Sequence, residues 1–66
     1  MKRYRYYIEN EYGEFFVARK STNGKWSPEF PDAMIFESYK NAASELRRLY
    51  VPFLTTLKRE EITVEG

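Results

Sequence analysis

The chain contains no cysteine and no histidine among its 66 residues. Without cysteine it forms neither a disulfide nor a thiolate metal site, and it has no cysteine nucleophile. Without histidine it lacks the commonest metal ligand and the usual acid–base group near neutral pH. A core of this size rarely contributes more than ~3–5 kcal/mol, so small folds often depend on disulfides, metals or oligomerisation. We expect one domain spanning residues 1–66, with self-association or a permanent partner as the remaining source of stability.

Long apolar runs are also absent. No stretch approaches the ~20 residues of a membrane-spanning helix, and no apolar segment of the kind found in signal peptides follows the charged N-terminal residues. The expected location is therefore the cytoplasm, without membrane association. Eleven basic and ten acidic side chains leave a net charge of +1. This balance is too even for net charge alone to steer the chain onto nucleic acid.

Patterns typical of catalysis and cofactor binding are missing as well. The sequence has no G-x-G-x-x-G or P-loop spacing. Ser38 has no histidine or lysine placed to activate it, and the adjacent Glu60 and Glu61 would point to opposite faces of a strand. We therefore expect a protein that is not an enzyme and that holds neither a metal ion nor a cofactor.

Aromatic side chains, in contrast, are abundant: six tyrosines, five phenylalanines and one tryptophan. In KRYRYYIEN, residues 2–10, apolar and charged side chains alternate with the period of a half-buried strand. Asn10 and Gly13 suit the ends of a tight turn, and EFFVARK, residues 14–20, follows as a second strand. Asn23-Gly24 predicts a type I′ reversal into a brief third strand over residues 25–27.

A helix is predicted over residues 39–50. Ser38 is a good N-cap, and the apolar side chains that follow are spaced to form one stripe. Pro52 disfavours helical geometry in the residue before it, so the helix should end near Val51. Residues 51–60 fit either a short helix or a strand, and residues 61–65 alternate as a closing strand.

This order of elements predicts an α+β fold, in which an antiparallel sheet of three or four strands carries one helix on one face. Two registers of the first hairpin are open. One pairs Ile8 with Phe15. The other has a three-residue loop ending in a bulge at Gly13 and pairs Ile8 with Phe16, and we favour it because it separates two glutamates flanking the loop. In both registers, one of the two phenylalanines lies on the face opposite the helix.

One short helix covers only one face of such a sheet. The near face, beneath the helix, is expected to take Tyr4, Tyr6, Ile8, Phe36, Leu46, Leu49, Tyr50 and Val64. Tyr7, one of Phe15 and Phe16, and Trp26 are left for the far face. Two arrangements are open there: these rings form an exposed patch, or residues 28–36, which carry Phe30 and Met34, fold over them as a lid.

The exposed-patch arrangement leads to a functional hypothesis. Tyrosine, tryptophan and arginine dominate binding hot spots. We predict a small binding module that associates stoichiometrically with a protein, either a different protein or a second copy of itself. The closing strand, if it forms a sheet edge, offers a further route to a homodimer. The predicted contact residues are Arg3, Arg5, Tyr7, Phe15, Phe16, Arg19, Lys25 and Trp26.

A nucleic-acid-binding domain is the alternative hypothesis. A sheet displaying Arg3, Arg5, Tyr7, Arg19 and Lys20 can stack bases and neutralise phosphates. In element order the chain is similar to integrase arm-binding domains, in which a three-stranded sheet is backed by a helix. The near-zero net charge and the glutamates of the first hairpin weigh against this alternative.

The order of these motifs also resembles small, mostly uncharacterised α+β proteins of phages and mobile elements. The resemblance rests on the YYIEN strand, the turn at Gly13, the segment DAMIFES before the helix, the Ala42-Ala43 pair and the closing ITVE strand. It covers roughly half of the chain. It implies a non-enzymatic protein that acts by binding, often to a host protein, including inhibitors of host defence systems. It carries over no functional residues.

Overall fold

The computed structural model describes residues 2–21 and 23–63, and this part of the chain contains four β-strands and one α-helix. The strands form one antiparallel sheet in the order β3-β2-β1-β4, which confirms the predicted α+β fold. In chain order the elements are β1 (Lys2–Asn10), β2 (Phe15–Ala18), β3 (Lys25–Ser27), the 3-10 helix η1 (Phe30–Asp32), α1 (Tyr39–Arg47) and β4 (Thr55–Thr63).

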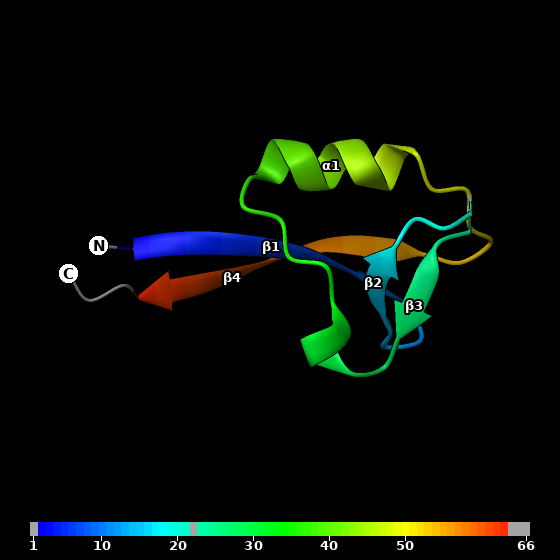
Figure 1. The fold of residues 1–66 in the computed structure, drawn as a ribbon, viewed down its shortest axis with the longest axis horizontal. Coiled ribbons are helices and arrows are strands. Elements are labelled where there is room, and N and C mark those ends of the chain that lie inside the picture. Colours follow the sequence, from blue (N-terminus) through cyan, green and yellow to red (C-terminus); the bar gives the residue numbers. More distant parts are fainter. Residues whose placement is uncertain (1, 22, 64–66) are drawn as a thin grey trace.

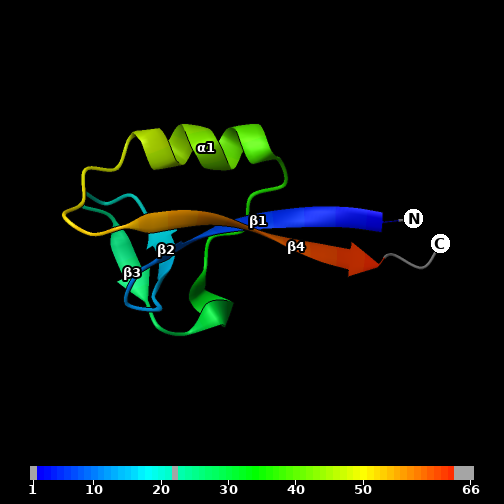
Figure 2. The same ribbon diagram turned by 180° about the vertical axis from the view of Figure 1, so that it is seen from behind.

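The sheet lies between two unequal layers. Figure 1 shows α1 on one side of the long β1–β4 pair and η1 with its flanking chain on the other side, and Figure 2 shows the same arrangement from behind. The connection from η1 to α1 therefore passes from one side of the sheet to the other. The sheet has a helix on its near face and an irregular loop at its far face.

The first hairpin adopts the favoured register. Glu9 lies opposite Phe15, which places Ile8 opposite Phe16. The backbone N–H of Asn10 donates to the Glu14 carbonyl at 2.9 Å, closing a three-residue loop. Gly13 ends this loop with φ +77°, a conformation that side chains other than glycine rarely adopt.

β2 pairs with β1 only near the hairpin loop. Beyond that point, residues 33–36 form the backbone hydrogen bonds to β1 and β2. Met34 donates a backbone hydrogen bond to Phe16 at 2.8 Å. Two residues further on, Phe36 and Tyr6 exchange backbone hydrogen bonds of 2.8 and 2.9 Å. This short antiparallel bridge fixes residues 33–36 against β1, so the chain from η1 is tied to the sheet before α1 begins.

The turn between β2 and β3 differs from the prediction. The N–H of Gly24 donates to the Ser21 carbonyl at 3.0 Å, and Gly24 has φ +75°. A type I′ turn needs positive φ at both Asn23 and Gly24, and among the described residues only the two glycines of these turns have positive φ. The type I′ prediction is therefore wrong, although the third strand forms over the expected residues.

The helix begins where the sequence predicts and ends earlier. The Ser38 Oγ accepts a hydrogen bond from the Asn41 N–H at 3.1 Å, which confirms Ser38 as the N-cap. The helix ends at Arg47 instead of near Val51, because the next two N–H groups bond three residues back. This tighter turn directs Leu49 into the core.

The core lies between α1 and the sheet. Ile8 and Phe16 are fully buried, Leu49 is nearly so, and Ala42 presents a fully buried small side chain on the helix. Tyr50, which was expected in this core, is 75% exposed because it lies beyond the end of the helix. Four partly buried side chains pack around the cluster: Trp26, Met34, Phe36 and Leu46.

The last strand is longer than predicted. The ambiguous segment 51–60 becomes β4 from Thr55 onward, and β4 pairs with β1 over nine residues. Val64 and Glu65, which were placed in the closing strand, lie outside the described residues. Within the described part of the chain, no helix has the length and apolar character needed to cross a membrane.

Candidate binding surfaces

Three aromatic rings pack together on the far face of the sheet. The Phe30 ring lies 4.9 Å from that of Tyr7 and 5.2 Å from that of Phe15, both edge-on. Tyr7 and Phe15 are themselves 5.7 Å apart. All three side chains are half-buried. Of the two arrangements left open, the lid is therefore the one observed, with Phe30 over the rings and Met34 packed instead against the core. The expectation of an exposed far-face patch is wrong.

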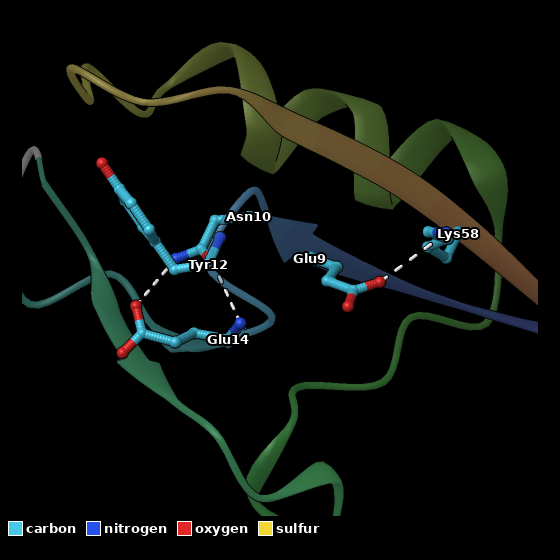
Figure 3. A network of polar contacts seen from close by, with 5 residues as sticks. All are labelled: Glu9, Asn10, Tyr12, Glu14 and Lys58. Atoms are coloured by element: carbon cyan, nitrogen blue, oxygen red, sulfur yellow. Dashed lines mark hydrogen bonds and ion pairs between the residues drawn. The ribbon is translucent and has the colours of Figure 1, made fainter.

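Ion pairs surround these rings. The Arg5 guanidinium lies 5.6 Å from the Phe30 ring, and its Nε and Nη2 each donate to Glu60 Oε2 at 2.9 Å. Lys58 Nζ lies 3.7 Å from Glu9 Oε1, as Figure 3 shows. Exposed pairs of this kind contribute little to stability, with a median near ~0–1 kcal/mol. They do mean that two basic side chains of this face already have carboxylate partners.

Two predicted contact residues lie on the near face. Phe16 is fully buried in the core and is not accessible to a partner. The Trp26 ring packs edge-on against Phe16 at 5.7 Å and against Phe53 at 5.3 Å, and its Nε1 donates to the Asn23 carbonyl at 2.7 Å. The expectation that Trp26 lies on the far face beside Tyr7 is therefore wrong.

The remaining predicted residues do not complete one surface. Arg19 is exposed and donates to Glu45 of α1 at 2.8 Å. Lys25 is exposed on β3, and Arg3 is exposed near the start of β1. The predicted contact set is thus divided between the near face, the far face and the sheet edge, instead of forming a single patch.

A shallow groove of about 340 Å³ lies at the end of the molecule that carries the termini. It contains the predicted contact residues Arg3 and Arg5, and Arg59 stacks 4.4 Å above the neighbouring Tyr4 ring. Basic, aromatic and aliphatic side chains line it together with the acidic Glu37. The lining is Arg3, Tyr4, Arg5, Ile35, Glu37 and Ile62.

Among the described residues, the large apolar side chains with the highest exposed fractions lie at the opposite end of the molecule. Connections 11–14 and 48–54 meet there, far from the chain termini (Figure 1). Exposure reaches 67% for Tyr12, 74% for Leu54 and 75% for Tyr50. The ring of Phe53 lies 5.7 Å from that of Tyr12 and links the two connections. We call Tyr12, Tyr50, Phe53 and Leu54 the distal patch.

Hydrogen bonds hold the backbone beneath the distal patch. The Glu11 N–H donates to the Leu54 carbonyl at 3.0 Å, and the Leu54 N–H donates to Glu11 Oε2 at 3.2 Å. Asn10, which is only 5% exposed, accepts from the N–H groups of Tyr12 and Glu14 through its Oδ1, both at 2.9 Å. Figure 3 shows the Tyr12 ring pointing away from this polar network.

The electrostatic setting of Tyr12 is acidic. A side-chain hydrogen bond to Glu11 raises the pKa of the Tyr12 phenol above its usual value, and the charges of Glu11 and Glu14 act in the same direction. Each of these interactions favours the neutral phenol over the phenolate. The raised pKa keeps the Tyr12 hydroxyl protonated, and so able to donate a hydrogen bond, at higher pH than an isolated tyrosine.

Sequence reasoning missed the distal patch for a specific reason. Tyr50 continues the apolar stripe of the helix, so it was placed in the core; only the early end of α1 turns it outward. Tyr12 lies in the predicted turn, and Leu54 lies in the segment 51–60, which fits either a short helix or a strand. The signal available in the sequence was Pro52, which shows that the chain leaves the helix in this region.

Neither a metal centre nor a relative guides the assignment of function. In residues 2–21 and 23–63, no three acidic side chains are placed to hold a metal ion together. Comparison with family models, with curated proteins and with solved structures finds no significant match to this chain.

Proposed function

We propose that the protein acts by stoichiometric, non-enzymatic binding to another protein, and that the distal patch is its contact surface. The observation that carries this proposal is the exposure of Tyr12, Tyr50 and Leu54, each at least two-thirds open to solvent at one end of the molecule. Contiguous exposed apolar side chains on a small domain typically mark interaction sites, and tyrosine is enriched among hot-spot residues.

The patch is also held in place before any partner arrives. One main-chain bond and one bond to the Glu11 carboxylate join Glu11 to Leu54 and so tie its two connections together, and the Asn10 side chain fixes the hairpin loop that carries Tyr12. Surfaces that are already ordered lose less conformational entropy on binding. This supports a docking surface over a pair of loosely tethered loops.

The far face is a weaker candidate for either kind of partner. Its rings are covered by Phe30, and two of its basic groups are paired with Glu60 and Glu9. A nucleic acid would have to displace these carboxylates to release the cations for its phosphates. We therefore propose a protein partner in preference to a nucleic acid. A host protein is the partner class that the sequence resemblance implies.

The test compares two double variants by affinity capture from the source cells with mass spectrometry. Tyr50→Ser with Leu54→Ser removes the apolar surface of the distal patch. Ile35→Ser with Tyr39→Ser, a matched control, removes two other exposed apolar side chains, which are 40% and 62% exposed. The captured partner is then titrated with each purified variant by calorimetry.

We expect the wild-type chain and the control to bind the same partner in a fixed ratio, and the distal-patch variant to lose at least tenfold in affinity. Both variants should unfold at temperatures close to the wild type, because the altered side chains are exposed. Equal affinity of both variants would overturn the assignment of the surface. Retention of nucleic acid that falls steeply with salt, without any protein partner, would favour the alternative function.

A further inference from the structure

The last strand forms a long open edge of the sheet. β4 pairs with β1 through all nine of its residues and ends the strand order β3-β2-β1-β4. No strand among the described residues lies on its outer side. An open edge of this length is a template for another strand.

The bridge at Tyr6 shows which backbone groups of β4 face outward. Tyr6 exchanges both of its backbone bonds with Phe36, so its N–H and C=O point away from β4. In an antiparallel pair of strands, two residues that lie directly opposite each other either both direct their backbone N–H and C=O groups toward the neighbouring strand or both direct them away from it. Arg59 lies opposite Tyr6. The outward-facing backbone groups of β4 are therefore those of Leu57, Arg59 and Glu61.

The β1–β4 pair is narrowest toward the chain termini. The β1–β2 pairing is confined to the other end of β1, and the bridge to Phe36 is made at Tyr6. Between residues 2–5 of β1 and residues 60–63 of β4, the described sheet is only two strands wide, and Figure 1 shows this part extending past α1. Two-stranded ribbons are marginal in water without a further strand.

The side chains of β4 select the kind of strand that fits this edge. The centre of β4 reads Lys58-Arg59-Glu60-Glu61. A parallel copy in register would oppose like charges, whereas an antiparallel copy can place Arg59 of one strand against Glu61 of the other. The edge is thus complementary to itself in one direction only.

A two-fold axis through the sheet pairs residues that lie on the same face. With the axis at Glu60, Arg59 of each chain lies opposite Glu61 of the partner subunit. Because the backbone groups of both residues face outward, this pair can also exchange backbone hydrogen bonds across the interface. The two Glu60 carboxylates then meet at the axis, each already bonded to Arg5 at 2.9 Å. An axis at Arg59 would instead oppose two guanidinium groups.

We propose that β4 pairs antiparallel with β4 of a second copy of this chain, around a two-fold axis at Glu60, to form one continuous sheet. The homodimer interface is separate from the distal patch, so this inference stands or fails independently of the proposed function. It also gives the narrow end of the sheet its missing strands.

Sedimentation equilibrium on the purified chain tests the association. From about 10 μM to about 1 mM, the mass should rise from the 8.0 kDa of one chain toward twice that value, since an interface limited to one strand pair is small. Arg59→Pro removes an outward-facing N–H and should hold the protein at the monomer mass. Proline is tolerated on an edge strand where its nitrogen faces solvent.

Charge exchange provides a second test that does not depend on proline being accommodated. Arg59→Glu and Glu61→Arg should each be monomeric alone, because each opposes like charges across the axis. Mixed in equal amounts, the two variants should form a heterodimer at the mass of two chains. A wild type that stays monomeric to ~1 mM, or variants that neither lose nor regain association, would overturn the proposal and leave the charges as edge protection.

A cysteine cross-link tests the position of the axis, because the native chain has no cysteine. Glu60→Cys places two thiols in a non-hydrogen-bonded pair with a Cα separation of ~4.5 Å, within the range of a disulfide. Air oxidation should cross-link this variant. Lys25→Cys, on the other edge strand, should remain monomeric under the same conditions. Equal cross-linking of both variants would contradict the register.

Discussion

Replacing Asn10 by alanine should destabilise the protein far more than the removal of one polar side chain usually does. Asn10 is 5% exposed, and its Oδ1 accepts two backbone hydrogen bonds of 2.9 Å from Tyr12 and Glu14. Its Nδ2 donates a third, also of 2.9 Å, to Glu14 Oε1. Each bond contributes ~1 kcal/mol net, and a buried donor left without an acceptor costs more. We expect a loss of about 2–3 kcal/mol.

That loss is a large fraction of what a core of this size supplies, which is ~3–5 kcal/mol. At ~4–8 °C per kcal/mol for a domain of this length, the melting temperature should fall by at least ~8 °C. Urea unfolding followed by tryptophan fluorescence measures the change. Glu14→Gln is the control, because its amide oxygen still accepts from Asn10, and it should change stability by less than ~0.5 kcal/mol. If Asn10→Ala unfolds like this control, the buried network does not hold the hairpin loop.

Four further substitutions test other parts of the structure. Gly13→Ala should lower the free energy of unfolding by ~1–2 kcal/mol, which is the penalty of placing a side chain at positive φ. No steric cost adds to this penalty, since the new Cβ would meet nothing within 4 Å. Gly24→Ala has a similar φ, but its Cβ would lie 3.1–3.2 Å from three side chains, so urea unfolding should show a further loss of ~1–2 kcal/mol; equal losses would contradict the packing. Phe30→Ala should cost ~2 kcal/mol, since the ring is half-buried, and should raise the fluorescence of an added hydrophobic dye. The pKa of Tyr12 should fall toward its ordinary value in Glu11→Gln, followed by ultraviolet titration against Tyr12→Phe. Because the native pKa is the raised one, any stabilisation from this phenol is present below the pKa of unfolded tyrosine, ~10, and is lost as pH rises through the native pKa.

Local signals in the sequence were sufficient for much of the fold. Period-two alternation located β1, Gly13 defined the hairpin loop, and Ser38 marked the first turn of α1. Each of these features depends on a few neighbouring residues. Even the hairpin register followed from a short-range argument about the charges flanking the loop, and the pairing of Glu9 with Phe15 agrees with it.

Features set by distant contacts could not be read in the same way. The face on which Trp26 lies depends on a register shift between Phe16 and Ala18, which no residue type announces. Phe30 covers the far face only because residues 33–36 are tied to β1 by the bridge to Tyr6. For this reason the candidate binding surface differs from the predicted one, because Phe30 packs against Tyr7 and Phe15, the far-face rings that were predicted to bind a partner.

α1 packs on one face of the sheet and Phe30 packs on the other, so the two proposals use an end of the molecule, at the distal patch, and the open edge at β4. If both hold, their geometry fixes the stoichiometry. The distal patch adjoins the start of β4 at Thr55, so an axis at Glu60 places the two copies of Thr55 ten positions apart along the strands, which is ~33 Å. The patches then face away from each other, and one small globular domain cannot contact both. Light scattering should therefore find two partner molecules per dimer. A complex of one partner with two chains would require the patches to converge, which antiparallel pairing of β4 does not allow.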